Sequence, residues 1–377
     1  MIENFEQLAS GATELQIRVK KGDLTVRAAE GAGWRLDWRS SDDQVPRLTR
    51  EGDRLRIEQP SEGWELFGQR RMDIELTVPL GLRAAQLSSG HGRIEAHALE
   101  GELQLNSGHG GATLRACRAD ADVATGHGNL TIEGHRGRIK ANSGHGRLRI
   151  EGLEGDADLQ TGHGNVDVIE AQGRLLLRTG HGRVEVVSTG GELDLETGHG
   201  GVDVSGPRSL TLRVENGNGD VRVEGGSLRG ARLKSGRGNL ISTAALEPGH
   251  YDLNTGVGSV EVALPSAARA RIVAHTGFGR VDSDVPLVQV GRSGPMPMGG
   301  ARMVGSVGEG EPEIELSLRT GKGDLRIHSG EVAAGSARST EWRFERPGRG
   351  PGRAGMRPGL AHGEHGPGRR LSASADR

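Results

Sequence analysis

The chain has 377 residues, a formal net charge of −2 and 64 glycines, and aromatic residues make up only 2% of it. A compact globule of this length normally buries more large side chains, so the composition favours a core built from thin layers of small aliphatic residues. Because the charge is close to neutral, no general attraction to membranes or nucleic acids is expected, and no specific nucleic-acid partner is predicted.

Residues 1–80 are predicted to form an N-terminal β cap that merges into the first coils of a repeat. Strands are predicted at 15–19, 24–27, 34–38, 55–57 and 72–78, separated by Gly-, Asp- and Ser-rich turns. The open end of a strand stack must be covered to prevent edge pairing, which is the role expected of this cap. Trp34, Trp38 and Trp64 fall here, and core packing is favoured over a ligand site around them.

The N-terminal segment also bears on location. The first 26 residues lack the basic, apolar and small-residue order of a signal peptide, and no run of 18 apolar residues occurs in the chain. No transmembrane segment is therefore predicted. A cytoplasmic location is the default expectation, and a role at the cell surface stays open.

A tetrapeptide of sequence Ser/Thr-Gly-His-Gly returns at a fixed spacing between Ser89 and Gly200. Its histidines follow one another every 18 residues, and they are His91, His109, His127, His145, His163, His181 and His199. A fixed period of this kind is typical of a solenoid, in which each repeat forms one coil and stacked coils build a continuous core. The fold class predicted is therefore all-β, a β-solenoid with about 18 residues per coil.

Two short strands per coil are predicted from the apolar columns of the repeat. With each histidine counted as position 0, apolar residues recur at positions +3, +5, +12 and +14. This alternation is the period of a half-buried strand, whereas a helix needs apolar residues three and four apart. Small residues at position +10, such as Gly101 and Gly137, indicate one corner, and the Gly-His-Gly element predicts the other. The lone cysteine, Cys117, shares position +8 with Leu99 and Leu153, so it is predicted to be a buried hydrophobic residue.

After Gly200 the repeat loosens but keeps a Gly-x-Gly frame, at 216–219, 235–238, 255–258, 276–279 and finally 320–323. Residues 81–330 are therefore assigned to the solenoid. A loop insertion is predicted at about 284–312, around the run Gly294-Pro295-Met296-Pro297-Met298-Gly299-Gly300. Residues 331–377 are rich in Gly, Pro and Arg and are predicted to be a disordered tail.

The order of these features resembles a known bacterial family. A strand ending in Val78-Pro79-Leu80-Gly81, then the Ser/Thr-Gly-x-Gly repeats, then a closing run from Arg319 to Ile327, is similar to the DUF4097 family. This family is also known as an adhesin or β-strand-repeat family, and the resemblance covers about residues 10–330. The resemblance implies a right-handed β-solenoid and says little about activity.

The seven histidines are the predicted chemical site. If the coils stack in register, neighbouring imidazoles lie one coil apart, and neutral imidazole is a common ligand for Zn, Ni or Cu. Later corners accept Asn218, Arg237, Val257, Phe278 and Lys322, so the corner does not itself require histidine. A structural metal site needs three or four ligands, whereas a linear column offers two per ion. Two interpretations stay open: a metal-binding column, and a purely structural stack of imidazoles that face in or out.

A carbohydrate-active enzyme on a β-helix scaffold is the rival class. Asp167, Glu185 and Asp203 recur at position +4 in consecutive coils, and paired carboxylates about 5 Å apart serve retaining glycosidases. The same column includes Arg149 and no aromatic residue lies near, so a solvated acidic strip is favoured. The predicted function is therefore non-enzymatic: a rigid β-solenoid surface that binds a protein, a polymer or an envelope component. No catalytic residue and no required cofactor are predicted, and the oligomeric state stays open.

Overall fold

The computed structural model describes residues 5–31, 33–41, 44–60, 71–293 and 300–330. The chain divides into two units, Met1–Ala337 and Arg338–Arg377, and every described residue belongs to the first. The predicted tail at 331–377, Trp64 and the predicted turn at 294–299 lie outside the described residues. The described part is all-β apart from one short helix, α1 (Phe5–Ala9). No helix within it is long and apolar enough to cross a membrane.

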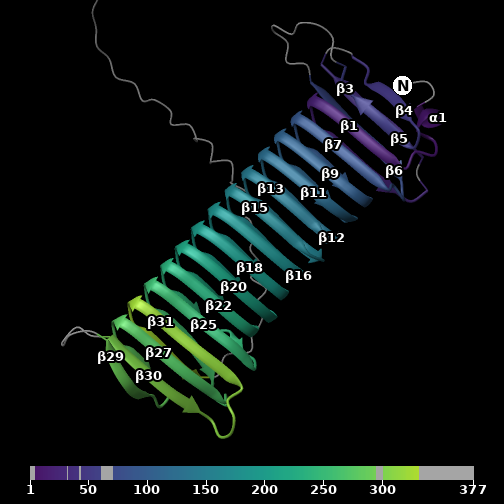
Figure 1. Ribbon diagram of the computed structural model, residues 1–377. Coiled ribbons are helices and arrows are strands. Elements are labelled where there is room, and N and C mark those ends of the chain that lie inside the picture. Colours follow the sequence, from purple (N-terminus) through teal and green to yellow (C-terminus); the bar gives the residue numbers. More distant parts are fainter. Residues whose placement is uncertain (1–4, 32, 42–43, 61–70, 294–299, 331–377) are drawn as a thin grey trace, which may run out of the picture. The chain divides into compact units, whose positions relative to one another are not determined.

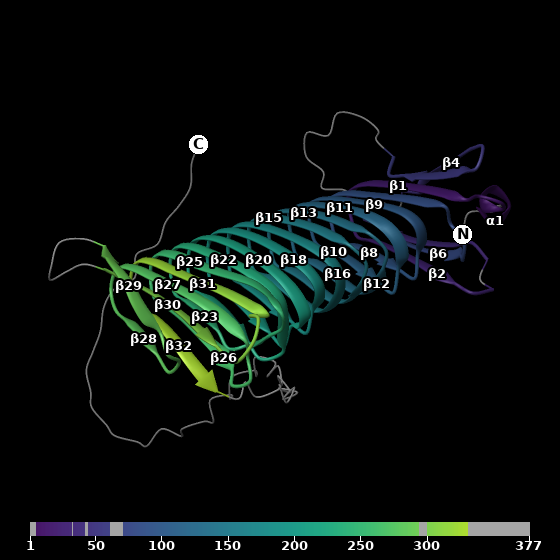
Figure 2. The same cartoon turned by 60° about the horizontal axis from the view of Figure 1, so that its bottom comes forward.

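Parallel strands lie side by side in two series, which Figures 1 and 2 show from two directions. Series A comprises, in spatial order, β1 (Glu14–Lys21), β7 (Ala84–His91), β9 (Glu100–His109), β11 (Arg118–His127), β13 (Ile139–His145), β15 (Ala157–His163), β16 (Val166–His181), β18 (Gly190–His199), β20 (Arg208–Asn218), β22 (Ser227–Arg237), β25 (Gly249–Val257), β31 (Ile314–Lys322) and β27 (Ala270–Phe278). Each of these strands except β1 ends on the middle residue of a Gly-x-Gly corner.

Series B carries the strand that follows each corner. It comprises β2 (Leu24–Ala29), β8 (Ile94–His97), β10 (Ala112–Arg115), β12 (Leu130–Arg136), β14 (Leu148–Glu154), β17 (Val184–Val187), β19 (Val202–Ser205), β21 (Val221–Glu224), β23 (Leu240–Ser242), β26 (Val260–Pro265), β32 (Leu325–Gly330) and β28 (Val281–Ser283). β16 serves both series, because its first residues pair with β17 and its later residues pair with β18. A two-residue strand, β24 (Ala245–Leu246), adds to β22.

The pairing register gives the length of a coil. In series A, Leu103 of β9 lies opposite Ala121 of β11, and in series B, Ala112 of β10 lies opposite Leu130 of β12. Both offsets equal 18 residues, as the spacing of the histidines predicted. Like residues therefore lie over like residues in consecutive coils of this stretch.

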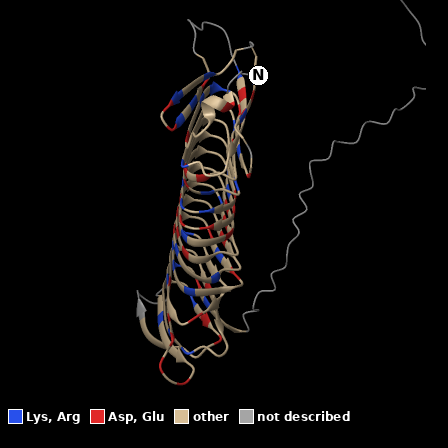
Figure 3. Cartoon of the chain, turned by 90° about the vertical axis from the view of Figure 1, so that its right-hand side faces the viewer, with Lys and Arg blue, Asp and Glu red and all other residues tan. Residues whose placement is uncertain are grey.

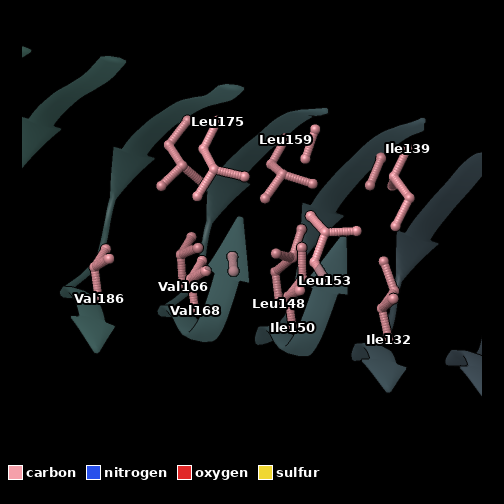
Figure 4. Packing of buried hydrophobic residues seen from close by; sticks show 14 of the residues in the cluster. Ile132, Ile139, Leu148, Ile150, Leu153, Leu159, Val166, Val168, Leu175 and Val186 are labelled. Carbon is pink, nitrogen blue, oxygen red and sulfur yellow. The ribbon is translucent and has the colours of Figure 1, made fainter. Parts of the chain in front are cut away.

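The hydrophobic core lies between the two series. Residues at the predicted apolar positions are almost all buried; for example, Leu148 and Ile150 of β14 and Leu159 of β15 are 0–1% exposed. Figure 4 shows that these side chains point from the two series toward each other, with Leu153 between them. Burying an aliphatic side chain of this size contributes about 1.5–3 kcal/mol. Repeated thin layers of this kind explain how the chain builds a core with few aromatic residues.

The turn between the series spans positions +7 to +10 of each coil. Position +7 takes the left-handed conformation, with φ of 53° at Ala98, 51° at Ala116 and 59° at Gly134. The glycines at position +10, where the small residues indicated the corner, also have positive φ values, such as 87° at Gly101 and 126° at Gly137. Ala98 and Glu170, each with a φ of 53°, are not residue types typical of turns, so the sequence did not indicate position +7. The small residues at position +10 therefore located the end of the turn, and the left-handed residue at position +7 was not predicted.

Antiparallel strands cover the N-terminal end of the stack. β5 (Arg54–Glu58) and β6 (Met72–Pro79) extend the two series beyond β1 and β2 in parallel, and β4 (Arg47–Glu51) and β3 (Arg35–Ser40) then pair with them antiparallel. Trp34 is buried, and the ring of Trp38 packs against the core while its Nε1 donates to the Gln44 carbonyl at 3.2 Å. The prediction that the tryptophans pack in the core is therefore confirmed for Trp34 and Trp38.

At the other end the chain order and the spatial order differ. β31 pairs with β25 on one side and β27 on the other, and β32 lies likewise between β26 and β28. The last repeat in the sequence therefore occupies the second-last place in the stack. The insertion predicted as a loop at 284–312 instead contains β29 (Val288–Ser293) and β30 (Gly300–Val307), and β30 pairs antiparallel with β27.

Candidate functional site

The seven histidines form one exposed column along series A. Each lies in register with the next, at the ends of β7, β9, β11, β13, β15, β16 and β18. Neighbouring ring centroids are 4.7–5.1 Å apart, and neighbouring ring planes are parallel within 4°. All seven residues are exposed, which answers the question of direction that the sequence left open. We call His91, His109, His127, His145, His163, His181 and His199 the histidine column.

The histidine column continues at both ends as other residues. Lys21 lies beside His91, and Asn218 lies beside His199. Beyond Asn218 follow, in spatial order, Arg237, Val257, Lys322 and Phe278. No acidic residue occurs among these positions, so the whole line is neutral or basic at every rung.

Buried hydroxyl groups hold the backbone of the corners. The Ser107 hydroxyl donates to the Gly92 carbonyl at 3.0 Å, and the Thr125 hydroxyl donates to the Gly128 carbonyl at 3.3 Å. The column imidazoles have no hydrogen-bond partner through their ring nitrogens among the described residues. The rings therefore contact one another without fixing the corner, and their nitrogens remain available to solvent or a ligand.

The ring geometry bears on metal binding. The lone pair of an imidazole nitrogen lies in the ring plane, so in parallel stacked rings the lone pairs run side by side. Since a Zn–N bond is about 2.0–2.1 Å long, an ion shared by His163 and His181, whose centroids are 4.9 Å apart, needs at least one ring to turn out of the stack. No group of three or more His, Cys, Asp or Glu side chains suited to a metal ion occurs in the described part. Metal binding by the column stays a prediction.

A groove of about 1530 Å³ runs across ten strands of series A, directly beside the histidine column. In nine of these strands the lining is the residue three before the column position, the buried Ser, Thr or Asn that follows it, and the first glycine of the corner, whereas β25 contributes Asn254 alone. The first five glycines, which are exposed, are Gly90, Gly108, Gly126, Gly144 and Gly162. We call this the glycine groove; each of its floor glycines is followed in the chain by the corner residue of the adjoining column.

The wall of the glycine groove changes character along its length. The first five coils present uncharged side chains, namely Ser88, Asn106, Ala124, Asn142 and Gln160. The next coils present charges that pair with each other: Arg178 Nε lies 3.4 Å from Glu196 Oε2, and Lys234 Nζ lies 3.5 Å from Glu215 Oε1. Sequence reasoning missed the groove, because the glycines that form its floor were read only as corner residues.

Two of the three carboxylates considered for glycosidase chemistry lie beside arginines. Asp167 and Asp203 lie in the same column of series B with Glu185 between them. Arg147 Nε is 3.4 Å from Asp167 Oδ2, and Arg222 Nη1 is 3.6 Å from Asp203 Oδ1. Asp167 and Asp203 are half-buried and ion-paired, and Glu185 between them is exposed, which agrees with an acidic strip at the surface rather than a catalytic pair. Figure 3 shows basic and acidic residues interspersed along the described strands.

A buried histidine was missed at the sequence level. His135 is fully buried at position +8, its Nε2 lies 2.9 Å from the Ala119 carbonyl, and its Nδ1 has no partner within the described part of the chain. Burial lowers the pKa of His135. Cys117, at the same position one coil earlier, is buried as predicted, and burial raises the pKa of its thiol. The signal that could have found His135 was a large polar residue in a column otherwise filled by Leu99, Cys117, Leu153, Ala171 and Thr189.

Stacked parallel strands with repeating corners define the chain as an all-β repeat protein. It belongs to the Toastrack DUF4097 family, whose profile matches residues 12–302. The resemblance drawn from the ordered corners is thereby confirmed. No curated protein matches the chain. A crystal structure of a "putative cell adhesion protein" from Clostridium sporogenes is similar at 12% identity, over 85% of this chain and 95% of that one, with a TM-score of 0.15.

Proposed function

We propose that the chain is a right-handed β-solenoid whose series A strands form a non-enzymatic binding surface for an extended polymer. Right-handedness is the rule for parallel strands joined by crossovers. The main support for this function is the glycine groove, which has a volume of about 1530 Å³ and presents the same glycine floor in consecutive coils. A ligand built from repeating units can make the same contact in each coil, so a linear polymer fits this surface better than a compact molecule does.

The rigidity of the surface supports this role. The first five coils of the groove consist of strands paired on both sides in continuous register. A surface that is already ordered loses little conformational entropy when it binds, which favours affinity. Non-enzymatic function is supported by the carboxylates at Asp167 and Asp203, which lie in ion pairs rather than in a cleft with an aromatic platform.

Metal binding through the histidine column is the second candidate. It is favoured by the exposure of all seven imidazoles and by their unpartnered ring nitrogens. It is disfavoured by the parallel ring planes, which must reorganise before two rings can share an ion. The stability of the metal-stripped chain with and without Zn, Ni or Cu tests this candidate.

Binding to linear polymers tests the proposed function. Dextran, polygalacturonate and poly-L-glutamate are titrated against the full chain and a variant with Ala124→Trp and Asn142→Trp, which fills two rungs of the groove wall. The matched control carries Thr113→Trp and Thr131→Trp on series B, away from the groove. We expect at least one polymer to bind the chain and the control equally and to bind the groove variant at least tenfold more weakly. Absence of binding to all three polymers, or equal binding by both variants, would contradict the proposal.

The prediction of a cytoplasmic location is tested separately by fractionating cells that carry the tagged chain. Recovery with the soluble cytoplasmic fraction supports that prediction. Recovery with the envelope contradicts it and points to a polymer outside the cytoplasm.

A further inference from the structure

We propose that the polymer bound along series A is an acidic polysaccharide, held by imidazolium groups of the histidine column, so that binding strengthens as the pH falls. This inference rests on the proposed function and names the class of polymer and the condition for binding. The partner is a chain of uronic-acid units, which supplies one carboxylate for each sugar ring.

The imidazole rings of the histidine column are closely and regularly spaced. Its rings recur every 4.7–5.1 Å over seven rungs. Imidazole gains its positive charge between about pH 8 and pH 5. Protonated rings of the column lie only 4.7–5.1 Å from one another. Cations at this spacing repel one another, and a row of anions that lies along them relieves that repulsion.

On the series B side, the charged groups nearest the histidine column are mainly arginines and their acidic partners. Two residues after each histidine, just before the next strand of the coil, the chain carries an arginine or a neutral residue, and the arginines are Arg93, Arg147 and Arg183. Their partners lie farther along series B, with Glu95 3.6 Å from Arg93, Asp167 3.4 Å from Arg147 and Asp203 3.9 Å from Arg183. These three acids are therefore paired with arginines, and Glu185, between Asp167 and Asp203, is the acid at this position beside the arginine-bearing coils for which the described residues show no ion pair.

On the series A side, too, few acidic side chains lie beside the histidine column. Among the residues three before each column histidine, Glu196 is the one acid in this described stretch, and its carboxylate lies 3.4 Å from Arg178 Nε. Further acids, such as Asp122 and Asp158, lie five residues before the column, beyond the groove wall. Lys21 and Arg237 continue the same line outside the histidines. A polyanion along the column therefore meets mainly basic and neutral groups.

The adjoining groove supplies the contact for the sugar rings. Its floor is exposed glycine backbone, which gives a flat apolar strip, and its wall carries amides at Asn106, Asn142 and Gln160. Amides donate and accept hydrogen bonds, as sugar hydroxyls require. The length of one pyranose unit in an extended chain is close to the spacing between coils. Carboxylates on the column and rings in the groove can therefore repeat together from coil to coil.

Binding of polygalacturonate and of dextran at pH 5.5 and pH 8.0, at constant ionic strength, tests this inference. The test variant carries His127→Asn, His145→Asn and His163→Asn, since Asn218 occupies the same line. The matched control carries His97→Asn, His250→Asn and His328→Asn, which lie outside the column. A third variant carries His127→Lys, His145→Lys and His163→Lys, because Lys322 also occupies this line and lysine holds its charge at pH 8.0.

We expect polygalacturonate to bind the chain and the control at least tenfold more tightly at pH 5.5 than at pH 8.0. The asparagine variant should lose that gain, and the lysine variant should bind tightly at both pH values. Tight binding of dextran with no effect of pH or of the column variants would overturn the acidic-polymer inference while leaving the proposed function intact. Failure of both polymers to bind would overturn this inference, and failure of poly-L-glutamate to bind as well would also overturn the proposed function. Equal thermal unfolding of the variants at pH 8.0 shows that altered binding does not arise from misfolding.

Discussion

Gly126 lies so close to Gly108 of the neighbouring coil that a Cβ atom on Gly126 would lie 2.5 Å from the Gly108 carbonyl oxygen. Real Cβ atoms do not approach a backbone oxygen so closely. The same contact recurs at 2.6 Å for Gly108 against Gly90 and for Gly144 against Gly126. Close stacking of the coils therefore requires the glycines that form the floor of the groove, and the groove follows from that requirement.

Gly126→Ala should destabilise the chain strongly. The added methyl group must push two coils apart or distort their ladder hydrogen bonds, and we expect a loss of about 2–3 kcal/mol in the free energy of unfolding. Urea-induced unfolding followed by circular dichroism measures this loss.

Gly134→Ala is the matched control for that substitution. Gly134 has a φ of 59°, and the nearest atom to a Cβ there is 4.0 Å away. Ala98 and Ala116 already adopt this conformation at the same position. The cost should therefore stay near about 1 kcal/mol. A Gly126→Ala variant no less stable than Gly134→Ala would contradict the close-stacking argument.

The sequence predicted those parts of the fold that repeat regularly. Apolar residues such as Leu148 and Ile150 alternate in every coil, and this alternation identified the strands, the core and the coil length. The order of the last coils was not predictable in this way. β31 carries the same Thr-Gly-x-Gly signature as its neighbours, and a shared signature does not tell which rung a strand occupies.

The sequence likewise predicted only part of the candidate site. Identical spacing of the histidines implied a column, and the structure stacks their rings. Their outward direction was not predictable, because the alternation of each strand ends at the corner. The left-handed corner was missed because Ala98 and Glu170 are poor turn residues that their coil neighbours hold in place.

His135→Leu should stabilise the chain, and more so in acid. The pKa of His135 is lowered by burial, so the folded state resists a proton that the unfolded chain accepts. Stability therefore falls as the pH drops through the ordinary imidazole range, near about 6.5, toward the lowered folded-state pKa. Leu99 and Leu153 fill this position in nearby coils, and removing the unpartnered Nδ1 should add about 1–3 kcal/mol.

Urea unfolding at pH 8 and pH 5 measures the effect of His135→Leu. A leucine side chain cannot bind a proton, so the gain in the free energy of unfolding should be larger at pH 5 than at pH 8. An equal gain at both pH values would contradict the titration argument. A loss of stability at both would show that the Nε2 contact with the Ala119 carbonyl outweighs the orphaned nitrogen.

Acid should also loosen the stretch around the histidine column. Protonated imidazoles 4.7–5.1 Å apart repel one another, so the melting temperature should fall by several degrees between pH 8 and pH 5. The variant with asparagine at His127, His145 and His163 should lose part of this dependence. Calorimetric scans check this, with His135→Leu as the background that removes the buried contribution. A melting temperature unchanged between the two pH values would refute it.

Transition metals should leave the stability of the metal-stripped chain unchanged. The parallel ring planes hold the nitrogen lone pairs apart, so no shared site is formed in the stacked arrangement. A ligand at 100 times its dissociation constant would add about 2.7 kcal/mol, which thermal unfolding with Zn, Ni or Cu readily detects. A shift that disappears in the asparagine variant would instead establish the column as a metal site.

Removal of β31 should destabilise more than its place in the sequence implies. Because β31 pairs with both β25 and β27, a chain ending at residue 312 leaves β27 without its parallel neighbour. We expect rapid hydrogen exchange in β27 and β30 and unchanged protection in β9 to β15. Full protection of β27 in the shortened chain would contradict the spatial order described here.

The most direct measurement is the number of protons taken up when polygalacturonate binds at pH 6.5, obtained by calorimetry in buffers of different ionisation enthalpy. If carboxylates lie along the histidine column, binding favours the charged imidazoles, and reciprocal linkage requires proton uptake. The account predicts net uptake that is lost in the asparagine variant and retained in the control with His97, His250 and His328 replaced. Binding without proton uptake, or no binding, would contradict it.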